Sequence, residues 1–249
     1  MPKGNRKNLA VPPKGSKGWL FTCDINRDQQ ATRQVIDVLN QLADPLTEGE
    51  AEEEQQEEKT LEQELADLKK PNQKQQRWIP YVSEVNGNVF IRFTQKQDDP
   101  FVLLERYFEE VRKRKGTLTN KVSKIYPIMY SGFPLSSESL PILQELVNKT
   151  FNAEKPVTYE VFLDRKHRGE ESGETHDELN NKIVKLVGAP HKPIYRKAEW
   201  AVLWQSLGRN LYLSVIPKWS EWCSCNIAKF CASLLKPAEP APPAEEKKE

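Results

Sequence analysis

The first half of the chain alternates between short apolar runs at strand spacing and longer runs at helical spacing. A β-rich run at 18–23 precedes a helix that we expect to begin near Asp28 and to stop at Asp44-Pro45. Two further runs, 78–85 and 88–93, flank Asn86-Gly87, a dipeptide typical of hairpin turns. A helix from about 100 to 115 and an apolar run at 125–130 follow, and the order β-α-β-β-α-β predicts a split βαβ unit.

The second half predicts another mixed unit. Leucines recur at helical spacing over 136–151, and apolar residues alternate with others over 157–163, which indicates a helix followed by a strand. A further helix is expected at 175–187, and strands at 200–207 and 210–216 are joined by Gly208-Arg209 as a hairpin or as close neighbours. Trp219, Trp222 and the apolar residues after them predict a short terminal helix, which would dock on the protein itself or on a partner.

These patterns predict an α+β fold with two ordered units. The expected divisions are a disordered basic tail at 1–17, a first unit at 18–125, a second unit at 126–217, a terminal helix at 218–235 and a disordered tail at 236–249. Within the first unit, the glutamate-rich stretch 46–70 is expected to be a disordered acidic insertion, because blocks of like charge repel one another and stay solvated.

The charges are segregated along the chain, although the net charge is only +1. Outside the acidic insertion the balance is basic, since residues 71–235 hold 24 Lys and Arg against 18 Asp and Glu. An excess of this kind favours contact with a phosphate backbone. It is also common in basic proteins that bind no nucleic acid, so the charge alone leaves both alternatives open.

Other classes of protein fit the sequence less well. No apolar run is long enough to span a bilayer and no secretory signal is present, so we expect a soluble intracellular protein without a membrane partner. Cys23, Cys223, Cys225 and Cys231 lack the paired spacing of a zinc site, which favours reduced thiols and no metal.

Catalytic motifs are missing as well. The chain has no GxGxxG or GxxxxGK loop and no HxE with PCxxC, which predicts no cofactor, no small-molecule substrate and no enzymatic activity of its own. A cryptic hydrolase or transferase remains the less favoured alternative.

Three cationic clusters are the candidate RNA-binding residues. Arg112, Lys113, Arg114 and Lys115 end a predicted helix, where the helix dipole favours cations with or without RNA. Lys121 and Lys124 precede an apolar strand, and their spacing is compatible with one sheet edge. Arg165, Lys166 and Arg168 follow the strand expected to end at Leu163, in a loop that either contacts phosphate or is simply exposed. Trp200 and Trp204 lie in an apolar strand and are expected in the core rather than stacked on bases.

Four segments together resemble a known family. They are Gly-Trp-Leu-Phe-Thr-Cys-Asp at 18–24, Val-Leu-Asn-Gln-Leu-Ala-Asp at 38–44, Asn-Val-Phe-Ile-Arg-Phe at 88–93 and Lys-Val-Ser-Lys-Ile-Tyr-Pro-Ile at 121–128. With the acidic insertion between the second and third, the chain resembles the eukaryotic THUMP-domain adaptors of tRNA cytidine acetylation over nearly all of 18–217.

The resemblance implies a ferredoxin-like domain followed by a THUMP domain at 126–217. It implies a nuclear protein, with nucleolar residence left open, that grips the acceptor-stem region of tRNA while a separate RNA cytidine acetyltransferase forms N4-acetylcytidine. It carries basic positions of the family onto Lys121, Lys124, Arg165, Lys166 and Arg168. Lys121 departs from the arginine that the family often has there, and lysine gives up bidentate phosphate recognition. The alternatives are a protein scaffold in an RNA-processing assembly and the RNA-binding subunit of another tRNA-modifying enzyme.

Overall fold

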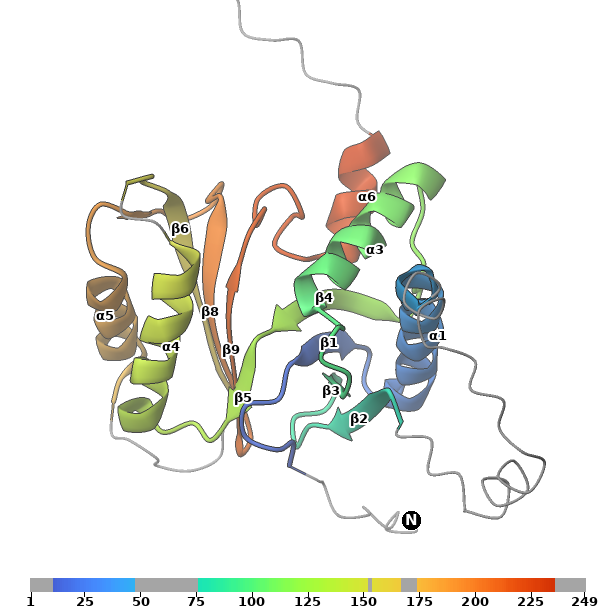
Figure 1. Ribbon diagram of the computed structural model, residues 1–249, viewed down its shortest axis with the longest axis horizontal. Coiled ribbons are helices and arrows are strands. Elements are labelled where there is room, and N and C mark those ends of the chain that lie inside the picture. Colours follow the sequence, from blue (N-terminus) through green and yellow to red (C-terminus); the bar gives the residue numbers. More distant parts are fainter. Residues whose placement is uncertain (1–10, 48–75, 152–153, 167–173, 236–249) are drawn as a thin grey trace, which may run out of the picture.

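The first unit is a four-stranded antiparallel sheet with two helices, as the sequence predicts. A computed structural model describes residues 11–47, 76–151, 154–166 and 174–235. The elements of the first unit are β1 (Gly18–Cys23), α1 (Asp28–Thr47), β2 (Trp78–Val82), β3 (Asn88–Phe93), α3 (Pro100–Arg114) and β4 (Val122–Ile128). The strand order is β2-β3-β1-β4, which is the arrangement of a β-α-β-β-α-β unit (Figure 1).

The second unit is a mixed five-stranded sheet with helices on one face. Its strand order is β5-β9-β8-β6-β7, in which β6 runs parallel to β7 and β8, and the other neighbours are antiparallel. The elements are β5 (Tyr130–Gly132), α4 (Ser136–Thr150), β6 (Thr158–Lys166), α5 (His176–Val187), β7 (Lys192–Pro193), β8 (Trp200–Leu207), β9 (Asn210–Ile216) and the terminal α6 (Ile227–Leu235). The expected hairpin at Gly208-Arg209 joins β8 to β9.

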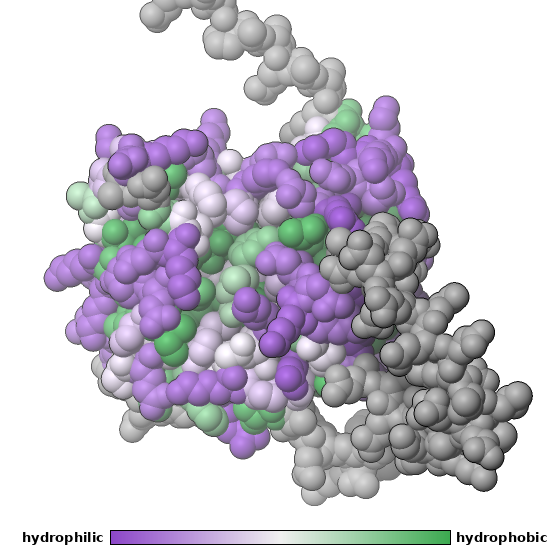
Figure 2. All heavy atoms as spheres, viewed as in Figure 1, coloured by the Kyte–Doolittle hydropathy of each residue, from purple (hydrophilic) through white to green (hydrophobic). Residues whose placement is uncertain are grey.

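The two sheets pack against each other and share one core. Alternate residues of β1 point to opposite faces, so Trp19 contacts α3, where its ring lies 6.2 Å from that of Tyr107. On the other face of this sheet, the ring centroid of Phe90 in β3 lies 5.0 Å from that of Tyr212 in β9. Figure 1 shows the resulting layers, with α4 and α5 beyond the second sheet and α1 beyond the first. The space-filling view of the same side shows apolar residues reaching the surface between the two halves (Figure 2).

Local sequence signals account for several helix ends. Asp99 caps the start of α3, because its carboxylate accepts hydrogen bonds from the backbone N–H groups of Phe101 and Val102. Thr175 and Glu178 form a reciprocal capping box at the start of α5. Gly87, with φ +74°, completes the turn between β2 and β3, and a Cβ there would lie 2.5 Å from the carbonyl oxygen of Cys23.

Several expected boundaries differ from the structure. Helix α1 continues past the expected stop at Asp44-Pro45 to Thr47, so positions 46 and 47 of the expected insertion are helical. Residues 48–70 lie outside the described residues. Strand β4 runs to Ile128, since it pairs with the whole of β1, so the division between the sheets falls after position 125.

The expected basic tail 1–17 is also partly ordered. Residues 11–17 are described, and the Gly15 N–H donates to the carbonyl oxygen of Ser131 at 2.8 Å. This backbone bond ties the segment to β5, and Lys14 adds an exposed ion pair with Glu138. Residues 1–10 and 236–249 of the two expected tails lie outside the described residues.

The terminal helix is shorter than predicted because a tight irregular segment precedes it. Lys218, Cys223, Ser224 and Cys225 have positive φ angles, so helical backbone begins only at Ile227. Trp219 and Trp222 lie in that segment, and both are buried. The Trp222 ring stacks on Phe108 of α3 with centroids 5.2 Å apart, so the C-terminal segment docks on the protein itself.

Cys23, Cys223, Cys225 and Cys231 are free thiols. In the part of the chain that the structure describes, no cluster of three or more His, Cys, Asp or Glu side chains is placed to hold a metal ion. No helix within the described ranges is both long and apolar enough to cross a bilayer.

Candidate nucleic-acid interface

Lys124 is a half-buried lysine between the two sheets. It lies on the same face of β4 as Tyr126, two residues further on, and this face packs against the second sheet. The Lys124 Nζ lies 5.7 Å from the centroid of the Phe162 ring on β6. Burial, followed by repulsion from Lys229 and Lys166, lowers the pKa of Lys124 below its ordinary value, while Asp164 opposes the shift.

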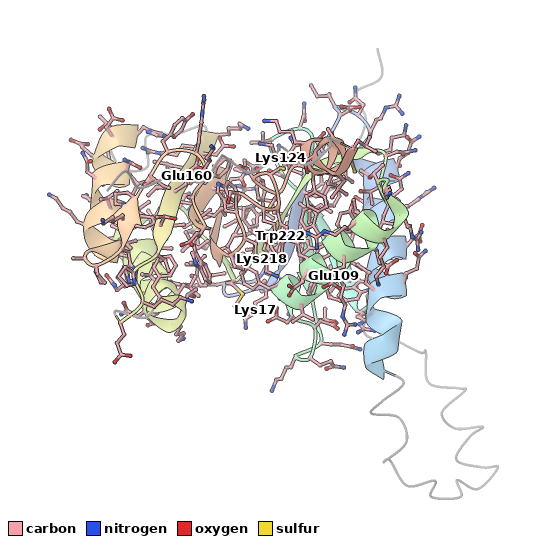
Figure 3. The ribbon with its side chains drawn as sticks, turned by 90° about the horizontal axis from the view of Figure 1, so that it is seen from above. Lys17, Glu109, Lys124, Glu160, Lys218 and Trp222 are labelled. Carbon is pink, nitrogen blue, oxygen red and sulfur yellow. The ribbon has the colours of Figure 1, made fainter. Side chains whose placement is uncertain are left out.

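Two further lysines act on Lys124 from different elements. Lys166 ends β6, and its Nζ lies 3.0 Å from the carboxylate of Asp164. Lys229 is an exposed residue of α6, and its charge is the largest electrostatic contribution to the lowered pKa of Lys124. We call Lys124, Lys166 and Lys229 the lysine cluster. Figure 3 shows Lys124 and Glu160 on the same side of the molecule. Glu160 and Lys166 both belong to β6 and lie on the same face of that strand.

The sequence missed Lys229 for a simple reason. It is the one charged residue of α6, 105 positions after Lys124, and no local pattern distinguishes it. The backbone pairing of Lys124 with Asn226 places the start of α6 beside β4. Only this tertiary contact brings the third lysine to the other two.

Arg165 and Lys166 do not form one cluster, contrary to the expectation for this loop. Strand β6 continues to Lys166 instead of ending at Leu163, so neighbouring side chains point to opposite faces. Arg165 points toward α5, and its guanidinium donates to the carbonyl oxygen of Glu174 at 2.7 Å. Arg168 lies outside the described residues.

Lys121 also lies apart from the cluster. It precedes β4, and its backbone N–H donates to the side-chain oxygen of Gln34 on α1 at 3.2 Å. Lys121 is half-buried and Gln34 holds its backbone against the helix side of the first sheet. The three-residue spacing from Lys124 therefore does not place both side chains at one shared site.

The cationic end of α3 is largely engaged with the protein's own carboxylates. Arg112 pairs with Glu221 at 2.9 Å, and Lys113 and Arg114 both pair with Glu110. Glu110 has a lowered pKa and Lys113 a raised pKa, mainly through their mutual hydrogen bond. Lys115 follows the helix as an exposed C-cap residue with φ +50°. These exposed pairs are screened by solvent and remain accessible to a competing anion.

The predicted cations therefore occupy several places instead of one continuous face. The structure separates two pairs that the sequence groups together, Arg165 from Lys166 and Lys121 from Lys124. It brings Lys124 of the first unit close to Lys166 of the second. Among the described residues, Lys166 and Lys229 act on Lys124 with a like charge, and Asp164, which pairs with Lys166 at 3.0 Å, is the carboxylate that opposes them. Such a group of lysines offers point charges to phosphate oxygens without fixing their geometry.

Comparison with known proteins gives a distant structural likeness. The crystal structure of PH1313 from Pyrococcus horikoshii Ot3 aligns with a TM-score of 0.45 and 8% sequence identity, over 82% of this chain and 56% of that chain. The crystal structure of TrmN from Thermus thermophilus aligns with a TM-score of 0.41 and 11% identity, over 79% of this chain and 44% of that chain. The chain thus spans about half the length of these two proteins. Because both TM-scores are below 0.5, neither likeness assigns a fold family or a function. No family model matches the sequence, and no curated protein matches it.

Proposed function

We propose that this protein binds a structured RNA, specifically tRNA, and that the lysine cluster contacts its phosphate backbone. The observation that carries the proposal is that Lys166 and Lys229, from two other elements, act electrostatically on half-buried Lys124, and that among the described residues Asp164 is the acid that opposes them. Because like charges repel, a half-buried lysine beside two others is costly in the free protein, and a polyanion offsets that cost.

The finer part of the proposal is that the protein is a non-catalytic adaptor. It would present tRNA to a separate RNA cytidine acetyltransferase in the nucleus, and the second unit would be a THUMP domain. The support is the resemblance of four segments, which fall on β1, α1, β3 and the whole of β4 with Lys121 just before it. Lysines without a planar, bidentate donor suit recognition of an A-form stem by charge and shape.

The RNA-binding proposal is tested by reversing the charges of the cluster. The triple variant Lys124→Glu, Lys166→Glu and Lys229→Glu should weaken tRNA binding at least tenfold at about 50 mM salt. The slope of log K against log salt should become shallower by about 2 to 3, since each lost phosphate contact removes about 0.7 to 0.9. Fluorescence anisotropy with labelled tRNA at several salt concentrations measures both quantities.

The matched control reverses the same number of charges elsewhere. Lys149, Lys155 and Lys185 are exposed, and Lys149 and Lys185 lie on the outer helices α4 and α5. Their triple glutamate variant should lose clearly less affinity than the cluster variant. Equal affinities for the two variants would mean that the cluster is not the contact surface.

The adaptor proposal has a separate test. The protein, a purified RNA cytidine acetyltransferase, acetyl-CoA and tRNA are combined, and modified cytidine is measured by mass spectrometry. Acetylation should require the enzyme and increase with the adaptor, and the cluster variant should remove that increase. Acetylation by this protein without the enzyme would overturn the non-catalytic assignment.

A further inference from the structure

A hollow of about 460 Å³ lies at the other end of β1 from the lysine cluster. Two segments form it, the approach to β1 at 13–17 and the end of β3 with the turn after it, at 92–98. Lys17, Arg92 and Lys96 line this hollow together with Lys14 and the polar residues Ser16 and Thr94. None of these positions was among the candidates from the sequence, because they are isolated cations in separate segments. We call this site the basic hollow.

The charge of the basic hollow is not neutralised from within. Among the described residues, Lys17, Arg92 and Lys96 have no carboxylate partner, and Lys14 alone pairs with Glu138 at 3.1 Å. Asp98, the acid in the lining, is engaged by Arg77 at 2.6 Å and has a fully buried side chain. Three cations therefore face the hollow without an opposing charge, although Arg92 is half-buried.

The backbone holds these cations in fixed positions. The Phe93 N–H donates to the carbonyl oxygen of Lys17 at 2.9 Å, and Gly18 pairs with Arg92 across the sheet. The Thr94 N–H donates to the carbonyl oxygen of Arg77 at 3.1 Å, which fixes the start of the turn that carries Lys96. Cations on ordered backbone lose less conformational entropy when they bind an anion than cations on a free tail.

The basic hollow is too far from the lysine cluster to share a phosphate with it. Thr22, five residues after Lys17, pairs with Lys124, and a strand of that length spans about 17 Å. Figure 3 shows the two labelled lysines, Lys17 and Lys124, on different sides of the ribbon. A single phosphate group cannot reach across this separation, so the two sites would contact different phosphates of the RNA backbone.

The geometry points to the basic hollow as a second phosphate-binding site, which takes backbone phosphates of the same RNA at a part that the lysine cluster does not touch. This inference rests on the proposed function, because it takes RNA as the ligand. It goes beyond the proposed function because it assigns phosphate binding to three further residues, Lys17, Arg92 and Lys96. Arg92 supplies the planar guanidinium that the lysine cluster lacks, which permits bidentate contact with phosphate.

The test compares charge reversal at the two sites in the full chain. The variant Lys17→Glu with Lys96→Glu should weaken tRNA binding about tenfold and make the salt slope shallower by about 1.5 to 2. Sites this far apart act independently, so combining this variant with the lysine-cluster variant should multiply the two fold-changes. Substituting Arg92→Gln should weaken binding by itself, and Arg92→Lys should restore only part of the loss.

The controls separate a failure of the basic hollow from a failure of the proposed function. Lys149→Glu with Lys185→Glu carries the same charge change, and thermal melting verifies that each variant is folded. If the cluster variant loses affinity and the hollow variant matches this control, the inference is overturned and the proposed function stands. If the wild-type protein does not bind tRNA, both are overturned.

A final arm distinguishes RNA from a small phosphate compound. Inorganic phosphate or a mononucleotide, added at about the concentration of bound tRNA, should leave the protein–tRNA complex intact. Displacement of tRNA by the mononucleotide in the wild type, but not in the hollow variant, would identify a free-nucleotide site and overturn the inference.

Discussion

Lys124 carries a charge that its surroundings make costly. Burial lowers its pKa, and Lys229 and Lys166 lower it further. Between the lowered pKa and the ordinary value of 10.5, the unfolded chain binds more protons than the folded one, so stability rises with pH in that window. The free protein thus gives up some stability to keep a lysine at this position.

A substitution at Lys124 separates stability from binding. Lys124→Met retains the apolar stem beside Phe162 and removes the charge, so the thermal midpoint should stay the same or rise slightly at neutral pH. The rise of stability with pH attributed to Lys124 should disappear. RNA affinity should fall, and the salt slope should become shallower by about 1. Melting curves between pH 7 and 10, with anisotropy in parallel, measure these effects, and Lys185→Met is the exposed control. A clearly lower midpoint would contradict this account of Lys124.

At the scale of elements, the cap of α3 makes a measurable contribution. Asp99 accepts hydrogen bonds from the N–H groups of Phe101 and Val102, at 2.7 and 3.1 Å. Asp99→Ala should lower the free energy of unfolding by about 1 kcal/mol, because both donors lose their partner. Asp99→Asn keeps an accepting oxygen and should recover most of that loss. Urea denaturation of the three proteins tests this, and equal midpoints would show that the cap is dispensable.

Periodicity and turn chemistry predict the elements but not all of their ends. The alternation in β6 is visible only to Leu163 because Asp164, Arg165 and Lys166 are all charged. Strand β8 extends the pairing, and the Gly208 N–H donates to the carbonyl oxygen of Lys166 at 2.8 Å. These three added residues of β6 alternate between the two faces of the sheet, which decides where each charged side chain lies. Because the pairing with β8 sets the end of β6, the sequence of β6 alone could not predict these positions.

At the scale of the whole molecule, the shared core couples the two units. Phe90 is fully buried, and it packs on Tyr212 of the other sheet. Phe90→Ala should cost about 3 to 5 kcal/mol of stability, and both sheets should still unfold in one transition. Circular dichroism and tryptophan fluorescence should therefore give coincident curves. Phe133→Ala is the control, since Phe133 is 52% exposed and its loss should cost under about 0.5 kcal/mol. Two separated transitions would show that the units are independent.

The lysine cluster depends on the packing of the whole molecule, because its three residues come from distant segments. Only part of it could therefore be predicted from the sequence. Lys124 and Lys166 were candidates in separate segments, but their proximity follows from the packing of one sheet on the other. Lys229 enters because the left-handed residues before α6 turn the chain back onto β4. The sheet topology of the first unit could be predicted from local patterns, whereas a site that joins three distant segments could not.

The two faces of β6 carry different charged contacts, so the register of this strand matters. Asp164 and Lys166 face the first unit, while Arg165 bonds to the chain just before α5. Inserting one residue before Asp164 would exchange the neighbours of all three, burying a lysine against helix α5 and removing the arginine from Glu174. An insertion or deletion of one residue here should therefore exchange the two faces, whereas a change of two residues should keep each charged side chain on its own side.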